Sequence, residues 1–330
     1  MTTVMVTGGA GFIGNFCIEK LLLRGDTVIC VDNFNNDYSP DQKLSNIKRF
    51  IEQKKFYLYN LDITDQNAMI RIFATHKIDK ILHLAARAGV RTSLQQPVWF
   101  VRDNLGGTAV LLELARQSGI KHFVMASSSS VYGGRTKIPF SETDPVDEPF
   151  SPYAMTKRAC ELMAYNYNHI CGMKIACLRY FTVYGPRNRP EMAIYQFAQR
   201  IYNNQLVEIY GENTQRDWTY VDDIVEGTLK VLDNINTIEF ETYNIGGGIP
   251  IQVSYLVELL QKELGKKALT RQVPLPMGDV PITCADTKKF EDKFGYKPTT
   301  SIEEGVKKFV IWFVEHQKHH LLDGQQQDNL

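Results

Sequence analysis

The sequence lacks an excess of charge of either sign and has few cysteines. Its 37 Lys and Arg residues balance 37 Asp and Glu residues, so no overall field attracts nucleic acid or an acidic membrane. The six cysteines include no Cys-x-x-Cys pair, which favours reduced thiols over disulfides or a metal site. No apolar run reaches the ~20 residues that span a bilayer, and a strand beginning at Thr3 leaves no room for a signal peptide. We therefore expect a cytoplasmic protein that binds neither nucleic acid, membrane nor metal.

A glycine-rich turn follows the first predicted strand. Gly8, Gly11 and Gly14 lie between an apolar run at 3–6 and an amphipathic helical run. Such a turn lets a diphosphate approach the backbone closely, and the free N–H groups of the helix then face the anion. Asp32 ends the next strand about 20 residues further on, where an acid can accept both ribose hydroxyls of NAD and repel the 2′-phosphate of NADP. The pattern predicts NAD binding, and the alternative is a glycine turn that binds nothing.

Short apolar runs alternate with helical patterns over residues 1–180. This alternation predicts a Rossmann-type, doubly wound parallel sheet whose ligands bind beyond the carboxyl ends of the strands. The expected strands are 3–6, 27–31, 56–61, 80–84, 122–126 and 174–178. The length of 330 residues suggests two domains. We expect residues 1–181 to form an NAD-binding domain, to which about 217–246 returns. Residues 182–330 would form a smaller mixed α/β substrate domain with a final helix near 302–316 and a frayed tail from about 317.

Polar side chains end the fifth strand and begin the helix that follows. Four consecutive serines at 127–130 are a poor choice for a core, so they favour hydroxyl chemistry. Ser151 and Pro152 are typical of a helix N-cap and first position. Tyr153 and Lys157 are four residues apart and share one helix face, where a cation favours the phenolate and so a base. A lone Tyr-x-x-x-Lys pair is common by chance, but the glycine turn and the serines make this pair a catalytic candidate.

Together these motifs resemble the extended short-chain dehydrogenase/reductase family, over nearly the whole chain from about Val4 to Val314. Within it the chain is similar to nucleotide-sugar 4-epimerases, above all those that act on UDP-glucuronate. The resemblance rests on residues 86–91, 127–133, 181–193, 216–224 and 278–280. It implies a homodimer paired through helices near 97–117 and 151–170. Relatives often show Trp-Gly where this chain has Arg187-Asn188, so the resemblance does not determine the shape of that loop.

The resemblance also implies roles for individual residues. Tyr153, Lys157 and Ser128 would be catalytic. NAD would be bound by Gly8, Gly11, Phe12, Ile13, Gly14, Asp32, Asn33, Asp62, Ile63, Leu84, Ala85, Ala86, Asn104, Tyr153, Lys157 and Tyr180. The UDP-sugar would be bound by Arg91, Ser128, Ser129, Ser130, Tyr153, Thr182, Arg189, Met192, Tyr210, Arg216 and Asp279. Among these, Arg216 would meet the diphosphate, Asp279 the nucleotide ribose and Tyr210 the uracil.

An acidic sugar poses a particular problem. A ketone at C4 turns the C5 carboxylate into a β-keto acid, which readily loses CO₂. A guanidinium can hold that carboxylate where its C–C bond is poorly aligned with the carbonyl π system. Arg189 is the candidate for this task, with Thr182 and Ser129 as hydroxyl partners. The expected reaction interconverts UDP-glucuronate and UDP-galacturonate through a 4-keto intermediate.

Other reactions of similar proteins leave alternatives. Related 4,6-dehydratases carry an Asp-Glu pair where this chain has Ser129 and Ser130, and related decarboxylases carry a Glu at Ser130. The serines favour epimerisation. The alternatives are a 4-epimerase of a neutral or N-acetylated UDP-sugar, a UDP-glucuronate decarboxylase, and a non-catalytic NAD-binding sensor.

Overall fold

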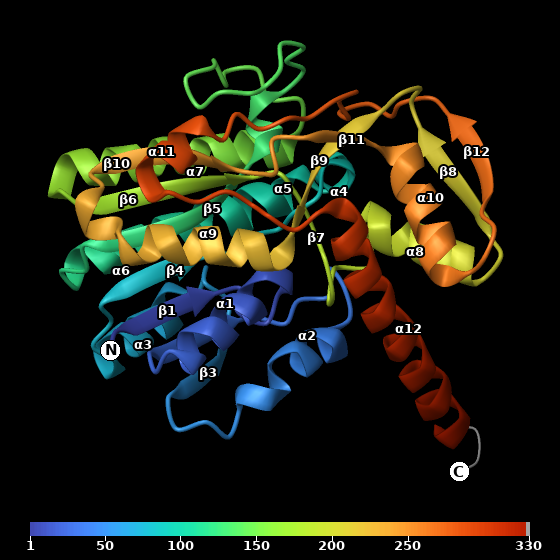
Figure 1. The fold of residues 1–330 in the computed structure, drawn as a ribbon. Helices are drawn as coiled ribbons and strands as arrows, with labels where there is room; N and C mark the ends of the chain where they lie inside the picture. Colours follow the sequence, from blue (N-terminus) through green and yellow to red (C-terminus); the bar gives the residue numbers. More distant parts are fainter. Residues whose placement is uncertain (328–330) are drawn as a thin grey trace.

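The computed structural model describes residues 1–327, and the side chains of residues 1–317 (Figure 1). In this part of the chain a seven-stranded parallel sheet runs in the order β10-β6-β5-β4-β1-β2-β3. Its strands are β1 (Thr3–Thr7), β2 (Thr27–Asp32), β3 (Phe56–Asn60), β4 (Lys80–His83), β5 (His122–Ser128), β6 (Lys174–Tyr180) and β10 (Phe240–Ile245). This order confirms the predicted doubly wound sheet.

Helices cover both faces of this sheet. One face packs against α1 (Phe12–Leu23) and α9 (Val221–Asp233), the other against α3 (Gln66–Thr75), α6 (Gly107–Gln117) and α7 (Pro152–Cys171). Alternate residues of β1 separate accordingly, since Val4 and Val6 belong to the first core and Met5 to the second. Burial on both faces explains why the strands are continuous apolar runs in the sequence.

Two smaller sheets follow β6. The first has the order β11-β9-β7, with β7 (Thr182–Tyr184), β9 (Gln215–Tyr220) and β11 (Pro250–Gln252). The second pairs β8 (Leu206–Tyr210) with β12 (Leu269–Val273). Figure 1 shows β8, β12, α8 (Ala193–Tyr202) and α10 (Val253–Leu264) together at one end of the molecule. Most of the chain after β6 therefore builds a separate mixed α/β layer. The exceptions are α9 and β10, which belong to the main sheet and its helices.

Short helices connect the larger elements. They are α2 (Pro40–Ile47), η1 (Lys48–Phe50), α4 (Val90–Gln95), α5 (Pro97–Phe100), η2 (Val101–Gly106), η3 (Ser129–Tyr132), η4 (Ile235–Thr237) and α11 (Lys288–Phe294). The last helix, α12 (Ile302–Gln327), continues past the expected end near residue 316, and residues 328–330 of the expected frayed tail lie outside the described residues.

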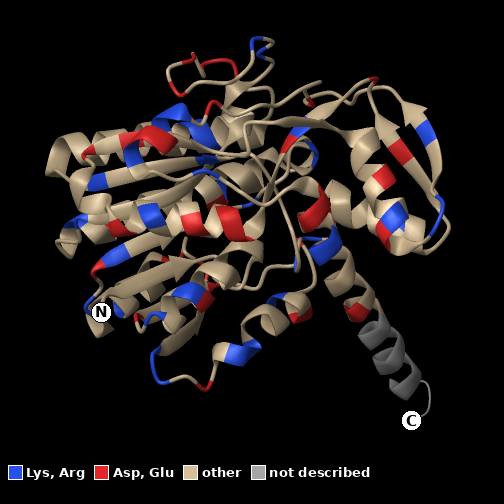
Figure 2. Ribbon diagram, in the orientation of Figure 1, with Lys and Arg blue, Asp and Glu red and all other residues tan. Residues whose placement is uncertain are grey.

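The charge distribution agrees with the balanced composition. Figure 2 shows basic and acidic residues interspersed over helices and strands. None of the helices within residues 1–327 combines the length and apolar character that a membrane crossing requires.

Candidate functional site

A cleft of about 700 Å³ lies at the carboxyl ends of the parallel strands. Its size is typical of ligand-binding sites. It brings together nearly all of the residues expected to bind cofactor or substrate: Gly8, Gly11, Phe12, Ile13, Gly14, Asp32, Asn33, Asp62, Ile63, Leu84, Ala85, Ala86, Arg91, Ser128, Ser129, Ser130, Tyr153, Lys157, Tyr180, Thr182, Arg189, Met192, Tyr210, Arg216 and Asp279. Residues from β1 to beyond β12 therefore line one site.

Asn104 is the exception, because it lies behind the wall of the cleft as the described residues form it. Its Oδ1 accepts the Arg87 N–H at 2.7 Å, and its Nδ2 donates to the Arg87 carbonyl at 3.1 Å and to Thr156 Oγ1 at 2.9 Å. A side chain whose amide is used in this way braces the turn after β4 against α7. The described contacts give Asn104 a supporting position, and its contact with NAD stays a prediction.

The glycine turn presents uncapped backbone to the cleft. Gly8 has φ +68° and accepts the Gly11 N–H at 3.1 Å. Gly11 is the N-cap of α1, and no side chain caps this helix end. The first N–H groups of α1 therefore lack partners within the helix and face the cleft at Phe12 and Ile13. This donor set fits a dinucleotide diphosphate.

Asp32 is buried at the end of β2, with 8% of its surface exposed. One carboxylate oxygen accepts the Ala10 N–H at 3.1 Å and the other accepts the Phe34 N–H at 3.0 Å. Burial raises the pKa of this carboxyl, while the two backbone bonds and Lys43 lower it. Each oxygen keeps a lone pair for a further donor, so the pair of ribose hydroxyls fits here.

The catalytic candidates come from β5 and α7. Ser151 Oγ accepts the Ala154 N–H at 3.1 Å, which confirms the predicted N-cap and fixes the start of α7. Tyr153 and Lys157 both reach the cleft, and Lys157 Nζ donates to the Ala126 carbonyl at 2.9 Å. This bond ties the helix to the end of β5, next to the serines.

Ser128 has a restricted hydrogen-bonding role. Its Oγ accepts the Ser130 N–H at 3.2 Å and the Ser130 hydroxyl at 2.9 Å. Both lone pairs are then used, so the Ser128 hydroxyl is left to donate. A donor beside a phenol can hold a substrate hydroxyl oxygen while the phenol takes its proton.

A buried ion pair joins the elements that carry these groups. Arg179 of β6 donates to both carboxylate oxygens of Glu161 on α7 at 2.9 Å. Ser127 Oγ donates to the same carboxylate at 2.6 Å. Removing one partner of such a pair typically costs ~3–5 kcal/mol, so the pair strongly constrains α7 relative to β5 and β6. The sequence did not predict this pair.

Charged side chains gather where the substrate nucleotide is expected. Arg91 donates to Asp279 at 2.8 Å, and its guanidinium lies 4.3 Å from the centre of the Tyr210 ring. Arg216 lies in the same cleft and donates to the Gln215 carbonyl at 2.9 Å. Burial lowers the pKa of Arg216, and the charge of Asp279 opposes this. Residues from α4, β8, β9 and the loop after β12 thus meet at one end of the cleft.

Arg189 lies on the loop between β7 and α8. Its Nη1 is 3.2 Å from Glu191 and its Nη2 is 3.3 Å from Met192 Sδ. Its charge reaches the loop after β2, because it opposes the increase in the pKa of Tyr38 that burial causes. A carboxylate bound by Arg189 would therefore share the guanidinium with Glu191.

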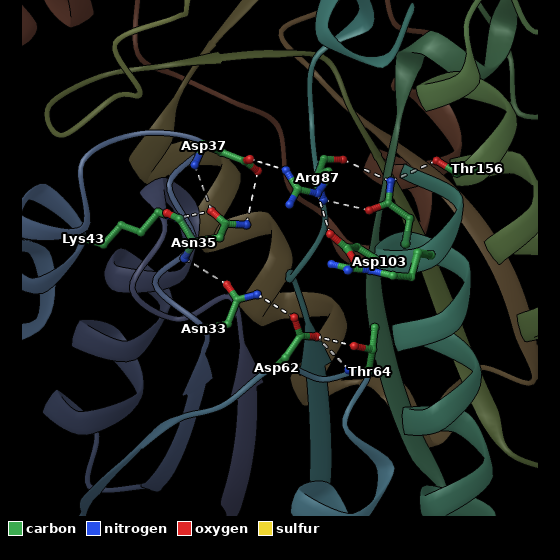
Figure 3. A network of polar contacts seen from close by, with 11 residues as sticks. Asn33, Asn35, Asp37, Lys43, Asp62, Thr64, Arg87, Asp103 and Thr156 are labelled. Carbon is green, nitrogen blue, oxygen red and sulfur yellow. Dashed lines mark hydrogen bonds and ion pairs between the residues drawn. The ribbon is translucent and has the colours of Figure 1, made fainter. Parts of the chain in front are cut away.

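A polar network joins the predicted Asn33 and Asp62 to residues of the neighbouring loops along the cleft (Figure 3). Arg87 donates to Asp103 at 2.5 Å and forms an ion pair with Asp37 of the loop after β2. Lys43 donates to the Asn35 carbonyl at 2.6 Å. The network links the loops that follow β2 and β4. Arg87 lies in the 86–91 stretch on which the resemblance rests, but its ion pairs with Asp37 and Asp103 were not predicted.

His83 ends β4 and is buried between the hydroxyls of Thr7 and Thr108. Thr108 Oγ1 donates to the Asn104 carbonyl at 2.6 Å, so it accepts from His83 Nε2 at 3.0 Å. In the neutral ring, His83 Nδ1 then accepts the Thr7 hydroxyl at 2.7 Å. Burial and, to a smaller extent, the charge of Lys157 together lower the pKa of His83 to about 3. The folded protein therefore holds this imidazole neutral.

This histidine should make the folded state sensitive to mild acid. The unfolded chain binds a proton at the ordinary pKa of 6.5, and the folded chain binds it only near pH 3. Stability is therefore complete above pH 6.5 and falls as the pH falls, by up to about 1.4 kcal/mol per unit. We expect His83→Gln to flatten the dependence between pH 6.5 and 4. Urea unfolding of the wild type and the variant across this range measures the free energy of unfolding at each pH. An equal pH dependence in both proteins would contradict the role of His83.

Comparison with known proteins places this cleft in context. A family model described as GDP-mannose 4,6 dehydratase matches residues 5–309. A UDP-glucuronate 4-epimerase of Thermodesulfobacterium geofontis is 43% identical over 314 residues, which cover 94% of this chain and 96% of that protein. The crystal structure of UDP-glucuronic acid 4-epimerase from Bacillus cereus, in complex with UDP-glucuronic acid and NAD, has a TM-score of 0.88 at 32% identity and covers 95% of this chain and 99% of its own. The structure of a Thermotoga maritima UDP-glucose 4-epimerase with UDP-glucose has a TM-score of 0.87 at 33% identity, with coverage of 96% and 99%.

Proposed function

Because the chain belongs to the GDP-mannose 4,6 dehydratase family, within the extended short-chain dehydrogenases/reductases, we propose that it is an NAD-dependent UDP-glucuronate 4-epimerase. It interconverts UDP-glucuronate and UDP-galacturonate through a 4-keto intermediate. The observation that carries this proposal is the single cleft in which Ser128, Tyr153 and Lys157 meet the uncapped start of α1. Full-length similarity to UDP-glucuronate 4-epimerases supports the choice of substrate.

The chain's own residues explain how such a reaction proceeds. Tyr153, as the general base, takes the proton of the sugar 4-hydroxyl, and Ser128 donates to the same oxygen. Lys157, held by the Ala126 carbonyl, lies on the same face of α7 as Tyr153 and would hold the nicotinamide ribose. Bound NAD would supply the hydride acceptor for sugar C4 and the hydride that restores C4 from the other face of the ketone. As C4 is reduced again, Tyr153 returns its proton to the former ketone oxygen and forms the new hydroxyl, so the base is restored after each turnover.

The name of the family does not decide the reaction. Dehydration needs an acid and a base to expel water across C5–C6, and Ser129 and Ser130 supply neither. The same serines disfavour a decarboxylase. Arg189 and Thr182 in the cleft favour an acidic sugar over the neutral sugar of the Thermotoga maritima structure. A non-catalytic sensor has no need of an intact Tyr153, Lys157 and Ser128 in one site.

Proton NMR of the purified protein with UDP-glucuronate and no added NAD tests the proposal. UDP-galacturonate is the expected product, and its formation requires that cofactor is retained. UDP-xylose or a 4-keto pentose would identify a decarboxylase instead. No change, even with NAD supplied, would exclude UDP-glucuronate and direct the assay to neutral and N-acetylated UDP-sugars.

Arg189→Gln should weaken the hold on the sugar carboxylate. Charged hydrogen bonds contribute about 1.5–3 kcal/mol, so the KM for UDP-glucuronate should rise by about 10- to 100-fold. The unrestrained 4-keto acid should also lose CO₂. NMR initial rates measure both effects, and binding of UDP-glucose, which has no carboxylate, is the control. An unchanged KM would assign the carboxylate to another residue.

The remaining proposals concern organisation. Residues 1–181, with 217–246, are proposed to bind NAD, and most of residues 182–330 to bind the UDP-sugar. A homodimer through the helices near 97–117 and 151–170 is supported by exposed apolar side chains there, such as Val98 and Leu162. The six free thiols fit a reducing, cytoplasmic compartment.

A further inference from the structure

Arg187 has a backbone conformation that its side chain does not favour. Its φ is +61°, a left-handed value that costs a residue with a Cβ about 1–2 kcal/mol. Such a conformation persists only where the surroundings hold it, and it concentrates at functional sites. The residue immediately precedes the Asn188-Arg189 pair. The sequence left the shape of the loop at Arg187-Asn188 undetermined. The contacts that hold Arg187 determine this shape.

Arg187 is held by the helix that begins at the glycine turn. Its Nη1 donates to Asn15 Oδ1 at 2.9 Å, and its guanidinium lies 5.3 Å from the centre of the Phe16 ring. Both partners belong to α1 and are more than 170 residues away in the sequence. The loop after β7 is thereby fastened to the cofactor side of the cleft.

Asn15 connects that anchor to the glycine turn itself. It is fully buried, and its Nδ2 donates to the Gly11 carbonyl at 3.0 Å and to the Phe12 carbonyl at 2.7 Å. Its Oδ1 accepts from Arg187 and, at 3.4 Å, from Arg49. The amide therefore uses both of its donors and both of its lone pairs. One side chain links the turn expected to hold the diphosphate with the loop that carries Arg189.

Asn188 extends this anchor to Arg189. It is fully buried, and its carbonyl accepts from Gln42 Nε2 of α2 at 3.2 Å. Its Oδ1 accepts the Arg189 N–H at 2.8 Å. Residues 187–189 are thus fixed from two helices of the cofactor side, and the position of the Arg189 backbone follows.

We propose that Arg187 and Asn15 are positioning residues that hold Arg189 in register with the glycine turn, and so determine whether the 4-keto acid is epimerised or decarboxylated. This rests on the proposed function. In the competing reaction the C5–carboxyl bond breaks and its electron pair passes into the C4 ketone as an enolate. CO₂ leaves, and the enolate takes a proton from water at C5. Holding the carboxylate out of alignment with the ketone suppresses this step.

Arg187→Ala removes the anchor without changing Arg189 itself, so Arg189 can shift from its position. A misplacement of about 1 Å can cost up to ~100-fold in rate, so we expect the ratio of decarboxylated to epimerised product to rise by about tenfold or more. Proton NMR of the NAD-loaded protein with UDP-glucuronate measures this ratio. Arg187→Gly removes the anchor but adopts positive φ without strain, so it should show the same rise. Arg187→Lys keeps a donor and should restore much of the wild-type ratio.

Arg49→Gln is the matched control, because Arg49 donates to the same Asn15 oxygen at the longer distance of 3.4 Å and acts on Arg187 only through its charge. Its product ratio should equal that of the wild type. Thermal unfolding of each NAD-loaded variant shows whether it is folded. If Arg187→Ala does not fold, the product ratio of Arg187→Gly tests the proposal instead. A wild-type ratio in both Arg187→Gly and Arg187→Ala would overturn the proposal.

Ligand affinity separates this inference from the proposed function. Calorimetry on NAD-loaded protein gives the ratio of Kd values for UDP-glucose and UDP-glucuronate without requiring turnover. If the wild type converts no UDP-glucuronate, the proposed function fails. The anchor is then supported if Arg187→Ala lowers the preference for the carboxylated ligand by about tenfold, and overturned if the preference is unchanged.

Discussion

Tyr153→Phe is expected to lower the rate of epimerisation by about 10²- to 10⁴-fold, the usual contribution of a positioned general base. The variant removes only the phenolic oxygen. The ring of Tyr153 packs edge-on against Phe100 at 6.1 Å between centroids, and phenylalanine keeps this contact. NAD should remain bound, because the glycine turn and Asp32 are unchanged. Proton NMR gives the rate, and absorbance of the nucleotide released from denatured protein gives the NAD content.

A second tyrosine provides the control for this variant. Tyr57 lies on β3 with its side chain exposed, so Tyr57→Phe should leave both rate and NAD content unchanged. A Tyr153→Phe protein that retains its rate within a few-fold would show that another group takes the proton. If the wild type and both variants bind NAD but no UDP-sugar, the result favours the non-catalytic sensor.

The main sheet was predictable because its strands are buried on both faces. Continuous apolar runs such as 27–31 have no competing interpretation when helical patterns flank them, and all six predicted strands begin at the observed residue. The site was predictable for a related reason. Parallel strands end at one edge, so Asp32, Ser128 and the glycine turn, far apart in the sequence, had to meet there.

Pairings between distant side chains were not predictable in this way. Glu161 and Arg179 form a buried pair, whereas nothing in the sequence distinguishes them from exposed charges. Asn104 is a second example. From the sequence it is expected among the NAD-binding residues, whereas its amide bonds to the backbone of Arg87. The loop at Arg187 depends on a helix near the other end of the chain. Such contacts depend on how distant parts of the chain pack together, so the local sequence around each residue does not predict them.

Gly14→Ala should abolish tight NAD binding. A Cβ at Gly14 would overlap the Gly8 carbonyl oxygen and lie 2.7 Å from Gly9 Cα, so backbone must move. The start of α1 then withdraws from the diphosphate, and losing two charged hydrogen bonds of about 1.5 kcal/mol each lowers the affinity ~100-fold. Calorimetric titration of NAD into protein stripped of nucleotide measures it. Gly106→Ala is the control, because its Cβ would meet only Thr64 Cγ2 at 3.9 Å and should leave affinity unchanged. Equal affinity in both variants would mean that the diphosphate lies elsewhere, since the glycine turn cannot accommodate both the Cβ and the anion.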